Sequence, residues 1–201
     1  MNDQYYTRVP KSESRPRDFS WTWRGNALTF RTDAGVFSRG EVDDGTKLLL
    51  DALPEEMTGD VLDLGCGWGA IGVSVGKNWP EVKVTMADVN LRALELAGGN
   101  AERNGVQAEC LESDGMSALA GRTFDAVITN PPIRAGKQVI YRMFADAAES
   151  LKPDGKLYLV IRKQQGAESC MKYLATLYGK VEKISRSGGF WVIQAGDPLK
   201  A

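Results

Sequence analysis

A short apolar run that ends in three alternating glycines constrains the fold of this chain more than any other feature. The run covers residues 61–64, and Gly65, Gly67 and Gly69 follow it before a second apolar stretch begins. Glycine lets the backbone approach a ligand closely, and the amide groups and dipole of a helix N-terminus favour a negatively charged group. The pattern therefore predicts a buried strand, a ligand-binding turn and a helix, in that order.

Short β-branched or apolar runs alternate with stretches of helical spacing from residue 60 onward. This alternation is typical of βα units and predicts an α/β fold with a mostly parallel sheet. We predict strands at residues 61–64, 82–87, 108–111, 124–129 and 157–161. Apolar residues at helical spacing predict two later helices, over residues 139–151 and 170–178. Between them, Lys152-Pro153-Asp154-Gly155 is predicted to turn the chain from the first helix into the next strand.

Two hairpins are predicted outside these units. Residues 19–23 alternate aromatic and polar side chains ahead of a Gly25-Asn26 turn, and residues 28–30 continue the alternation. Near the other end, residues 181–184 and 189–195 are separated by only four residues, with no helix between them. That spacing predicts an antiparallel hairpin at the end of the sheet.

The length of 201 residues suits one well-buried domain with an N-terminal elaboration. We assign residues 1–58 to an extension that holds the first hairpin and a helix packed on the core, and residues 59–201 to the core. The chain has no eighteen-residue apolar run, and its first residues lack the basic and apolar regions of a signal peptide. A cytoplasmic protein without a membrane segment is therefore expected.

The composition excludes several classes of chemistry. The chain has no histidine, which removes the commonest general base, and its three cysteines show no C-x-x-C spacing. Neither a metal site nor a disulfide framework is expected, and Cys66 inside the glycine turn is interpreted as a structural residue. Basic residues outnumber acidic ones at both ends of the chain, whereas the middle is acidic. Charge alone leaves open either a phosphate-binding face or scattered surface charge.

Polar residues beside the predicted strands suggest what the glycine turn binds. Asp63 suits the positively charged amino acid portion of a sulfonium cofactor, Asp88 lies at a distance suited to ribose hydroxyls, and Asp114 offers an acceptor to an adenine amine. Asn130 opens an N-P-P-I sequence at the predicted carboxyl end of the fourth strand, where open α/β sheets bind ligands. The glycines followed by Ala70 also fit a dinucleotide fingerprint. A nicotinamide-dependent oxidoreductase or a non-catalytic nucleotide-binding module therefore stays open.

The sequences D-L-G-C-G-W-G, A-D-V-N, S-D-G and N-P-P-I, in that order, resemble the motifs of class I S-adenosylmethionine-dependent methyltransferases that act on amino groups. The resemblance covers residues 60–195 and implies a seven-stranded Rossmann-like sheet with its last strand antiparallel, and S-adenosylmethionine as the cofactor. Residues 32–38 and 43–50 further resemble the catalytic half of the ribosomal small-subunit guanine-N2 methyltransferases. That match implies that Phe37 and Ser38 line the cofactor or active-site pocket.

The motifs, the resemblance and the positions of the basic residues together predict three sets of site residues. The cofactor-binding set is Phe37, Asp63, Gly65, Gly67, Gly69, Asp88, Asn90 and Asp114. The catalytic set is Asn130, Pro131, Pro132 and Ile133. The RNA-binding set is Arg134, Lys137, Arg162 and Lys163, with Arg142 expected at the same rim.

The N-P-P-I sequence suits methylation of an amine, because an exocyclic amine on a base is a poor nucleophile whose lone pair is delocalised into the ring. The Asn130 side-chain oxygen and the Pro131 carbonyl provide two acceptors that bind both amine hydrogens and turn the lone pair toward the sulfonium methyl. No strong base is required, which suits a chain without histidine. Ile133 departs from the commoner aromatic residue, which stacks on a flipped base.

The sequence therefore predicts an RNA methyltransferase that acts on guanine N2. Its expected partner is ribosomal RNA or a ribosomal subunit, and either a monomer or a dimer is left open. A protein methyltransferase acting on a glutamine amide is the first alternative, because the same two acceptors can orient a carboxamide nitrogen. Trp21 and Trp23 are expected in the hairpin core rather than as an RNA-stacking surface, and Trp68 in packing or a cofactor-side wall. Asp43 and Asp44 are candidates for a helix cap.

Overall fold

A seven-stranded sheet forms the centre of the computed structural model, which describes residues 7–199. The strand order is β5-β4-β3-β6-β7-β9-β8; the pairs among β3 to β7 are parallel, whereas β9 is antiparallel to β7 and to β8. The strands are β3 (Asp60–Leu64), β4 (Lys83–Asp88), β5 (Ala108–Glu112), β6 (Phe124–Thr129), β7 (Leu151–Arg162), β8 (Tyr178–Ser187) and β9 (Phe190–Pro198). The predicted fold class is confirmed, including the antiparallel last strand.

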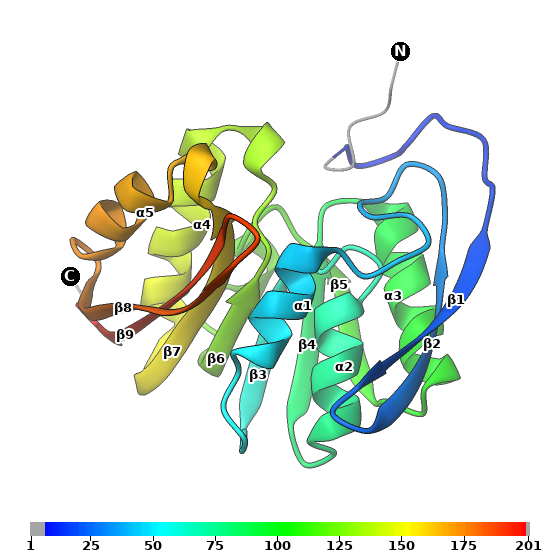
Figure 1. Cartoon of the computed structure of the whole chain (residues 1–201), viewed down its shortest axis with the longest axis horizontal. Helices are drawn as coiled ribbons and strands as arrows, with labels where there is room; N and C mark the ends of the chain where they lie inside the picture. Colours follow the sequence, from blue (N-terminus) through cyan, green and yellow to red (C-terminus); the bar gives the residue numbers. More distant parts are fainter. Residues whose placement is uncertain (1–6, 200–201) are drawn as a thin grey trace.

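Helices cover both faces of the sheet (Figure 1), so the central strands are buried on two sides and have nearly continuous apolar sequences. One core contains side chains of α1 (Asp44–Asp51), α2 (Ala70–Asn78) and α3 (Leu91–Arg103). The other core contains side chains of α4 (Lys137–Ser150) and α5 (Ala167–Leu174). The fold therefore has three layers, with the sheet in the middle.

The direction of strand succession reverses between β3 and β6, and this reversal positions the site. From β3 the chain moves outward through β4 to the edge strand β5, and then returns to β6 on the other side of β3. The crevice at the carboxyl ends of such strands is where open α/β sheets bind ligands. Short 3₁₀ turns follow three of the strands there: η1 (Ser117–Leu119), η2 (Ile133–Ala135) and η3 (Lys163–Gln165).

The N-terminal hairpin pairs β1 (Arg17–Trp23) with β2 (Asn26–Thr32). Its turn is Arg24-Gly25, one residue earlier than predicted. Both turn residues have a left-handed φ, 45° and 78°, which matches the tight turn favoured by the twist of a hairpin. Trp23 is 3% exposed and packs in the core, as expected, whereas Trp21 is half-buried with its ring stacked on that of Trp23.

Two buried asparagines on α3 hold the hairpin against the core. The Asn100 side chain accepts a hydrogen bond from the Arg31 amide at 2.7 Å and donates one to the Arg31 carbonyl at 2.9 Å. The Asn104 side chain does the same with Thr29, at 2.9 Å and 2.8 Å. Because the asparagines are four residues apart on one helix face, they meet alternate residues of β2 as a neighbouring strand would.

Three predicted boundaries are wrong, and each differs because strand pairing prevails over local pattern. β7 begins at Leu151, so Lys152-Pro153-Asp154-Gly155 lies within the strand, where the register with β6 shifts, and not in a turn. α5 ends at Leu174, and the buried Tyr178 begins β8 instead of continuing the helix. The last hairpin turns at Gly188-Gly189, two glycines with positive φ.

The division of the chain at residue 58 stays a prediction. In the structure, α1 contacts β7, β8 and β9, and the hairpin contacts α2 and α3. The Trp23 indole also donates a hydrogen bond to Asp51 of α1 at 2.9 Å. Residues 1–6, on which the expectation of no signal peptide partly rests, lie outside the described residues. Within residues 7–199, every helix is too short or too polar to cross a membrane.

Candidate active site

A cavity of about 440 Å³ lies at the carboxyl ends of the central strands, where the sequence predicted the cofactor. Gly65 and Gly67 line it from the turn after β3, and Asp88 lines it from the end of β4. Asp114 and Asn130 line it from the segments that follow β5 and β6. The structure therefore brings together side chains from four strands that are separated in the sequence, at the point where strand order reverses.

The glycine turn leaves room for a ligand at Gly67. Its φ is +55°, a conformation that favours glycine, and its amide donates a hydrogen bond to Asp88 Oδ2 at 2.8 Å. A side chain built at Gly67 would meet no protein atom within 4 Å. Gly69, by contrast, does not line the cavity: it begins α2, and a side chain there would lie 3.2 Å from the Ala97 backbone. The structure thus explains Gly69 by helix packing.

Asp63 lies buried behind the turn and does not line the cavity surface. Its Oδ2 accepts a hydrogen bond from the Gly72 amide at 2.8 Å, whereas Oδ1 has no hydrogen-bond partner among the described residues. Burial raises the pKa of Asp63 to about 7, and the nearby Asp88 charge adds to this rise. A buried carboxylate with one unpaired oxygen favours a cationic group in the adjoining cavity.

Asp88 and Asn90 have different tasks after β4. Asp88 accepts hydrogen bonds from the Gly67 and Asn90 amides, both at 2.8 Å, and burial raises its pKa. Asn90 is fully buried and does not line the cavity. Its side chain accepts a hydrogen bond from the Ala93 amide and caps α3, and it also donates to the Gly35 carbonyl at 3.1 Å. Asn90 therefore orients the segment that carries Asp88.

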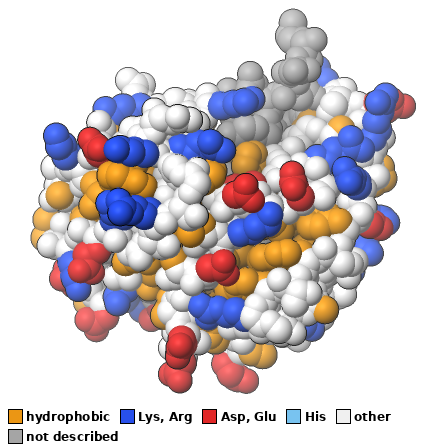
Figure 2. Space-filling model, in the orientation of Figure 1, with side chains coloured by type: hydrophobic (Ala, Val, Ile, Leu, Met, Phe, Trp, Pro, Cys, Tyr) orange, Lys and Arg blue, Asp and Glu red, His pale blue; other side chains and the backbone are white. Residues whose placement is uncertain are grey.

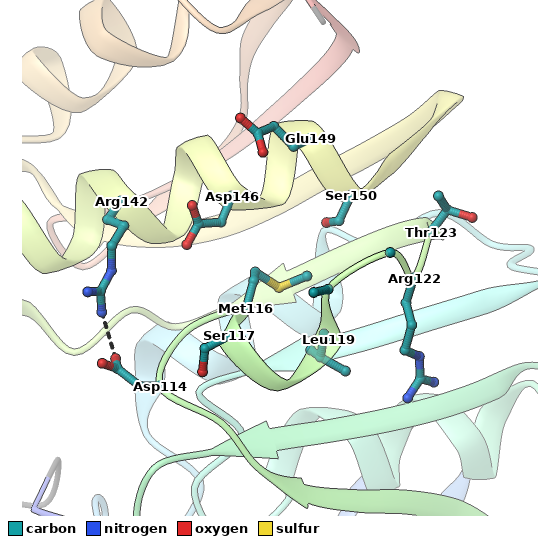
Figure 3. A pocket seen from close by; sticks show the side chains of 12 residues that line it. Asp114, Met116, Ser117, Leu119, Arg122, Thr123, Arg142, Asp146, Glu149 and Ser150 are labelled. Atoms are coloured by element: carbon teal, nitrogen blue, oxygen red, sulfur yellow. Dashed lines mark hydrogen bonds and ion pairs between the residues drawn. The ribbon is translucent and has the colours of Figure 1, made fainter. Parts of the chain in front are cut away.

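Asp114 stands between the first cavity and a second one of about 460 Å³ (Figure 3). Arg142 of α4 points toward it and donates a hydrogen bond to Asp114 Oδ1 at 2.6 Å. The Arg142 guanidinium is therefore paired at the cofactor side, and its expected place at the phosphate-binding rim stays a prediction. Both side chains are at least half exposed, so this ion pair is weak and can open for a ligand.

Asn130 stands at the junction of the first cavity and an outer cavity of about 660 Å³. Phe37 lines both cavities as well, which agrees with its predicted place at the pocket. The outer cavity is lined by Val36, Phe37, Ser38, Glu41, Asp43, Asp44, Asn130, Pro131, Ile133, Arg134, Arg162, Gln164, Gln165 and Phe190. A group bound in the outer cavity thus meets the first cavity at the Asn130 side chain.

The two ends of the Asn130 amide are in different environments. Its Nδ2 donates to Thr46 Oγ1 at 3.0 Å and lies 3.4 Å from both carboxylate oxygens of Asp43. Asp43 is also the N-cap of α1, since its side chain accepts from the Gly45 and Thr46 amides. Within the described residues, Asn130 Oδ1 accepts no hydrogen bond. Helix α1 therefore fixes the amide so that its oxygen is free to accept from a ligand.

The rest of the N-P-P-I sequence divides between the two cavities. Pro131 is buried and lines the outer cavity, and its carbonyl oxygen accepts no hydrogen bond from the described residues. The Pro132 carbonyl, in contrast, accepts from the Ala135 amide at 2.8 Å and closes η2, while its ring lines the first cavity. Ile133 is half-buried in the outer cavity. Two free acceptors, on Asn130 and Pro131, are therefore adjacent in the chain.

Basic side chains lie at the outer cavity and beside it: Arg134 and Arg162 line it, and Lys137 and Lys163 lie close to them in the sequence. Arg134 and Lys137 follow β6, and Arg162 and Lys163 end or follow β7. All four are exposed, and none forms an ion pair within residues 7–199. Figure 2 shows Lys and Arg side chains along the upper part of the molecule, the end at which η2 lies. These cations are available to phosphate groups.

Cys66 and Trp68 inside the glycine turn have structural roles. Cys66 is buried, and burial raises the pKa of its thiol, which opposes formation of a nucleophilic thiolate. Trp68 is 3% exposed and packs edge-on against Phe19 and Phe30. Its indole also donates a hydrogen bond to the Phe37 carbonyl at 2.8 Å, so it holds the loop that lines both cavities. Within the described part of the chain, no cluster of side chains suited to a metal ion was found.

Residues 27–194 match the family model described as Methyltransferase small domain. The chain belongs to this family. YbxB, an uncharacterized protein of Bacillus subtilis (strain 168), is 41% identical over 198 residues, which cover 97% of this methyltransferase and 98% of YbxB. Ribosomal RNA small subunit methyltransferase C of Hahella chejuensis (strain KCTC 2396) is 37% identical, and the match covers 80% of the chain and 50% of that relative.

Among solved structures, a T. thermophilus 16S rRNA N2 methyltransferase (RsmC) in complex with AdoMet and guanosine superposes with a TM-score of 0.83 and 29% identity. The match covers 94% of this chain and 52% of that one. The chain thus spans about half the length of the relatives named as ribosomal RNA methyltransferases. The predicted methyltransferase class is confirmed by the family, which does not support the nicotinamide-dependent alternative.

Sequence reasoning missed three residues at the site of this methyltransferase. Thr46 accepts from Asn130, Asp43 contacts the same amide while capping α1, and Phe190 enters the outer cavity from the start of β9. Asp43 and Thr46 lie in residues 43–50, whose resemblance to the guanine-N2 enzymes was the available signal. Phe190 follows two glycines at the far end of the chain and carried no such signal.

Proposed function

We propose that this methyltransferase transfers a methyl group to the exocyclic N2 amine of a guanine in ribosomal RNA. The observation that carries the proposal is the position of Asn130, which lines both the cofactor cavity and the outer cavity and whose oxygen accepts no hydrogen bond from the described residues. A methyl donor in one cavity and an amine in the other would meet at this acceptor. Such an arrangement orients two reactants without forming a covalent intermediate on the protein.

S-adenosylmethionine is the cofactor, as the family and the match to a solved complex with AdoMet support. When bound, it supplies an electrophilic methyl group on a positively charged sulfur. The first cavity fits it, since Gly67 has open space for close backbone approach and Asp63 offers an unpaired buried oxygen behind the turn. We assign Asp88 to the ribose hydroxyls and Asp114 to the adenine amine, because both line that cavity.

The side chains at the junction position the amine. Asn130 Oδ1 and the Pro131 carbonyl accept its two hydrogens, and this directs the nitrogen lone pair toward the first cavity. Thr46 and Asp43 keep the amide from turning, since they bind its nitrogen. A methylated amine that carries an extra proton loses it readily to water, so the absence of histidine from the chain is no obstacle.

A guanine base fits the outer cavity better than a glutamine side chain does. The cavity of about 660 Å³ exceeds what a carboxamide needs, and its lining includes the acidic Glu41 and Asp44 and the basic Arg134 and Arg162. Guanine presents N–H donors beside a carbonyl acceptor on one edge, which suits a lining that offers both acceptors and donors. The basic rim then binds phosphates of the same RNA, in keeping with relatives named for ribosomal RNA. A substrate of this kind places the protein in the cytoplasm.

In vitro methylation tests the proposal. Small-subunit ribosomal RNA, free and assembled into subunits, is incubated with the protein and labelled S-adenosylmethionine, and the nucleosides are identified by mass spectrometry. We expect N2-methylguanosine with the wild-type protein and about a hundredfold less with Asn130→Ala. A glutamine-containing ribosomal protein fraction serves as the competing substrate. Label in that fraction and none in RNA would contradict the proposal in favour of the protein alternative.

A further inference from the structure

The outer cavity contains an aromatic ring that the N-P-P-I sequence itself does not supply. Phe190, the first residue of β9, is half-buried and lines this cavity together with Asn130 and Ile133. Phe37 is the other aromatic residue there, but it also lines the first cavity and therefore stands at the junction. Phe190 lines the outer cavity but not the first one, so it lies on the substrate side of Asn130.

The sheet holds the Phe190 ring beside a cation. Phe190 pairs across β7 and β9 with Arg162, and the guanidinium carbon of Arg162 lies 4.3 Å from the ring centroid. The Lys163 amide donates to the Gly189 carbonyl at 2.8 Å, which continues the strand pairing past Arg162. Within residues 7–199, Arg162 forms no ion pair, so its N–H groups stay available. Strand pairing thus holds the backbones of Phe190 and Arg162 side by side, and the guanidinium lies against the ring.

Helix α1 leaves space for this ring at its first turn. A side chain built on Gly45 would lie 2.9 Å from Phe190 Cε1 and 3.1 Å from Cδ1, closer than packed atoms approach. Gly45 lies in the chain between Asp43 and Thr46, the two residues that hold the Asn130 amide. One helix turn therefore positions the amine-binding oxygen and contacts the ring of Phe190.

We propose that Phe190 and Arg162 form a stacking platform for the guanine whose amine Asn130 orients. The proposal rests on the proposed function and assigns to these two residues the task that the aliphatic Ile133 does not perform. Unpaired bases in RNA are held by stacking on aromatic rings and on arginine planes, and a cation beside the ring strengthens the surface. The ligand class is a planar nucleobase extruded from its strand.

Kinetics of Phe190→Leu and Phe190→Ala test the platform, with Trp191→Leu as the matched control. Trp191 is the next residue, is also half-buried and also has a cation, Lys183, at 4.0 Å from its ring, but it packs in the core on the opposite face of the sheet. We expect the KM for RNA to rise roughly 5- to 150-fold in both Phe190 variants, since a stacked base contributes about that much to binding. Trp191→Leu should leave this KM unchanged, and S-adenosylmethionine affinity should stay constant in all three.

A rescue experiment separates stacking from folding. Adding Ile133→Phe to Phe190→Leu returns an aromatic ring to the same cavity, and we expect it to recover most of the lost RNA affinity. Absence of rescue, an unchanged KM in Phe190→Ala, or an equal effect of Trp191→Leu would each overturn the platform. RNA binding is also measured by fluorescence anisotropy with the demethylated cofactor present. If the wild-type protein neither binds nor methylates the RNA, the proposed function fails; if it does both and Phe190→Ala matches it, only the platform fails.

Discussion

At the scale of single residues, the chemistry depends on an amide whose nitrogen is held and whose oxygen is free. Asn130 donates to Thr46 and lies within 3.4 Å of Asp43, so rotation of the amide would place its oxygen against a carboxylate. That repulsion sets the orientation of the side chain more firmly than hydrogen bonding alone. The amide donor therefore acts on the protein, and the acceptor is left for the substrate.

Replacing Asn130 by aspartate tests this division of tasks. The new carboxylate would lie about 3.4 Å from that of Asp43, and two like charges at this distance repel strongly. We expect Asn130→Asp to lose as much methylation rate as Asn130→Ala or more, on the order of a hundredfold or greater. Single-turnover methylation at neutral pH measures the rate, and cofactor affinity serves as the check on folding.

The double variant Asp43→Asn with Asn130→Asp is the control for that prediction. It restores one amide and one carboxylate at the same two positions, and asparagine caps a helix N-terminus about as well as aspartate does. We expect it to be more active than Asn130→Asp alone. If the single Asn130→Asp variant instead keeps more activity than Asn130→Ala, the Asp43 contact does not govern the amide.

The pH dependence of cofactor binding should report Asp63. Burial raises its pKa to about 7 in the folded protein, above the unfolded value of about 3.9, so the folded state binds more protons between these values. Ionisation of Asp63 therefore lowers the free energy of unfolding as pH rises from about 4 to about 7. A cationic cofactor favours the ionised form, so S-adenosylmethionine affinity should rise with pH through about 7 and binding should release protons.

Calorimetry in buffers of different ionisation enthalpy measures that proton release. Asp63→Asn should bind the cofactor more weakly and with little change between about pH 6 and pH 8, because no carboxyl group remains to titrate there. The pH dependence of cofactor binding in Asp63→Asn is compared with that in Asp88→Ala, which lacks a carboxyl group that lines the cavity itself. An equally steep pH profile in Asp63→Asn would assign the titration to another group.

At the scale of elements, the hairpin depends on Asn100 and Asn104 for hydrogen bonds along the edge of β2 that does not pair with β1. Isolated two-stranded hairpins are marginally stable in water. Here Asn100 and Asn104 satisfy the amide and carbonyl groups of Arg31 and Thr29, respectively. The Asn100 side chain also donates a hydrogen bond to the Trp68 carbonyl at 2.8 Å. Hydrogen bonds therefore connect the hairpin, the glycine turn and α3. The Trp68 indole adds the Phe37 loop to this unit by donating to the Phe37 carbonyl.

Removal of either asparagine should destabilise the protein. Asn100→Ala and Asn104→Ala each leave part-buried backbone groups unpaired, and we expect each to lower the free energy of unfolding by about 1–3 kcal/mol. Urea denaturation followed by circular dichroism measures this loss. Asn26→Ala is the matched control, because that asparagine is only part-buried and its side chain bonds one side chain at 3.0 Å. An equal loss of unfolding free energy in all three variants would show that the hydrogen bonds of Asn100 and Asn104 to β2 stabilise the protein no more than the Asn26 contact does.

At the scale of the whole molecule, cations are concentrated at the strand ends beside the outer cavity, which Arg134 and Arg162 line. Arg134, Lys137, Arg162 and Lys163 come from two neighbouring strand ends and none is neutralised by an ion pair within residues 7–199. The net charge of −1 gives no overall attraction to RNA, so binding depends on this local arrangement.

Charge reversal at the rim should change RNA binding and its response to salt. We expect Arg134→Glu with Lys137→Glu to weaken RNA binding and to reduce the slope of log affinity against log salt by about 1 to 2, since each lost phosphate contact removes roughly 0.7 to 0.9. Cofactor affinity should stay nearly unchanged. Lys83→Glu, at the amino end of β4, is the control on the opposite edge of the sheet. An unchanged slope in the rim variant would mean that these cations do not contact phosphates.

Local sequence pattern was enough to predict those parts of this protein that depend on neighbours along the chain. Apolar runs located the parallel strands within one residue, apart from the early start of β7, because a strand buried on two faces needs continuous apolar side chains. The glycine turn, Asp88 and Asn130 could be assigned to one edge of the sheet, since parallel strands place their carboxyl ends together.

Which distant side chains share the cavity with Asn130 depends on contacts between segments far apart in the chain. Asp43 and Thr46 reach it from α1, and Phe190 reaches it from β9, which inserts between β7 and β8 instead of at the edge. The same non-local pairing made Tyr178 a strand residue despite its helical spacing, and the packing of α4 brought Arg142 to Asp114. Strand order and register set these contacts through hydrogen bonds and packing between segments far apart in the chain, and no local spacing encodes them.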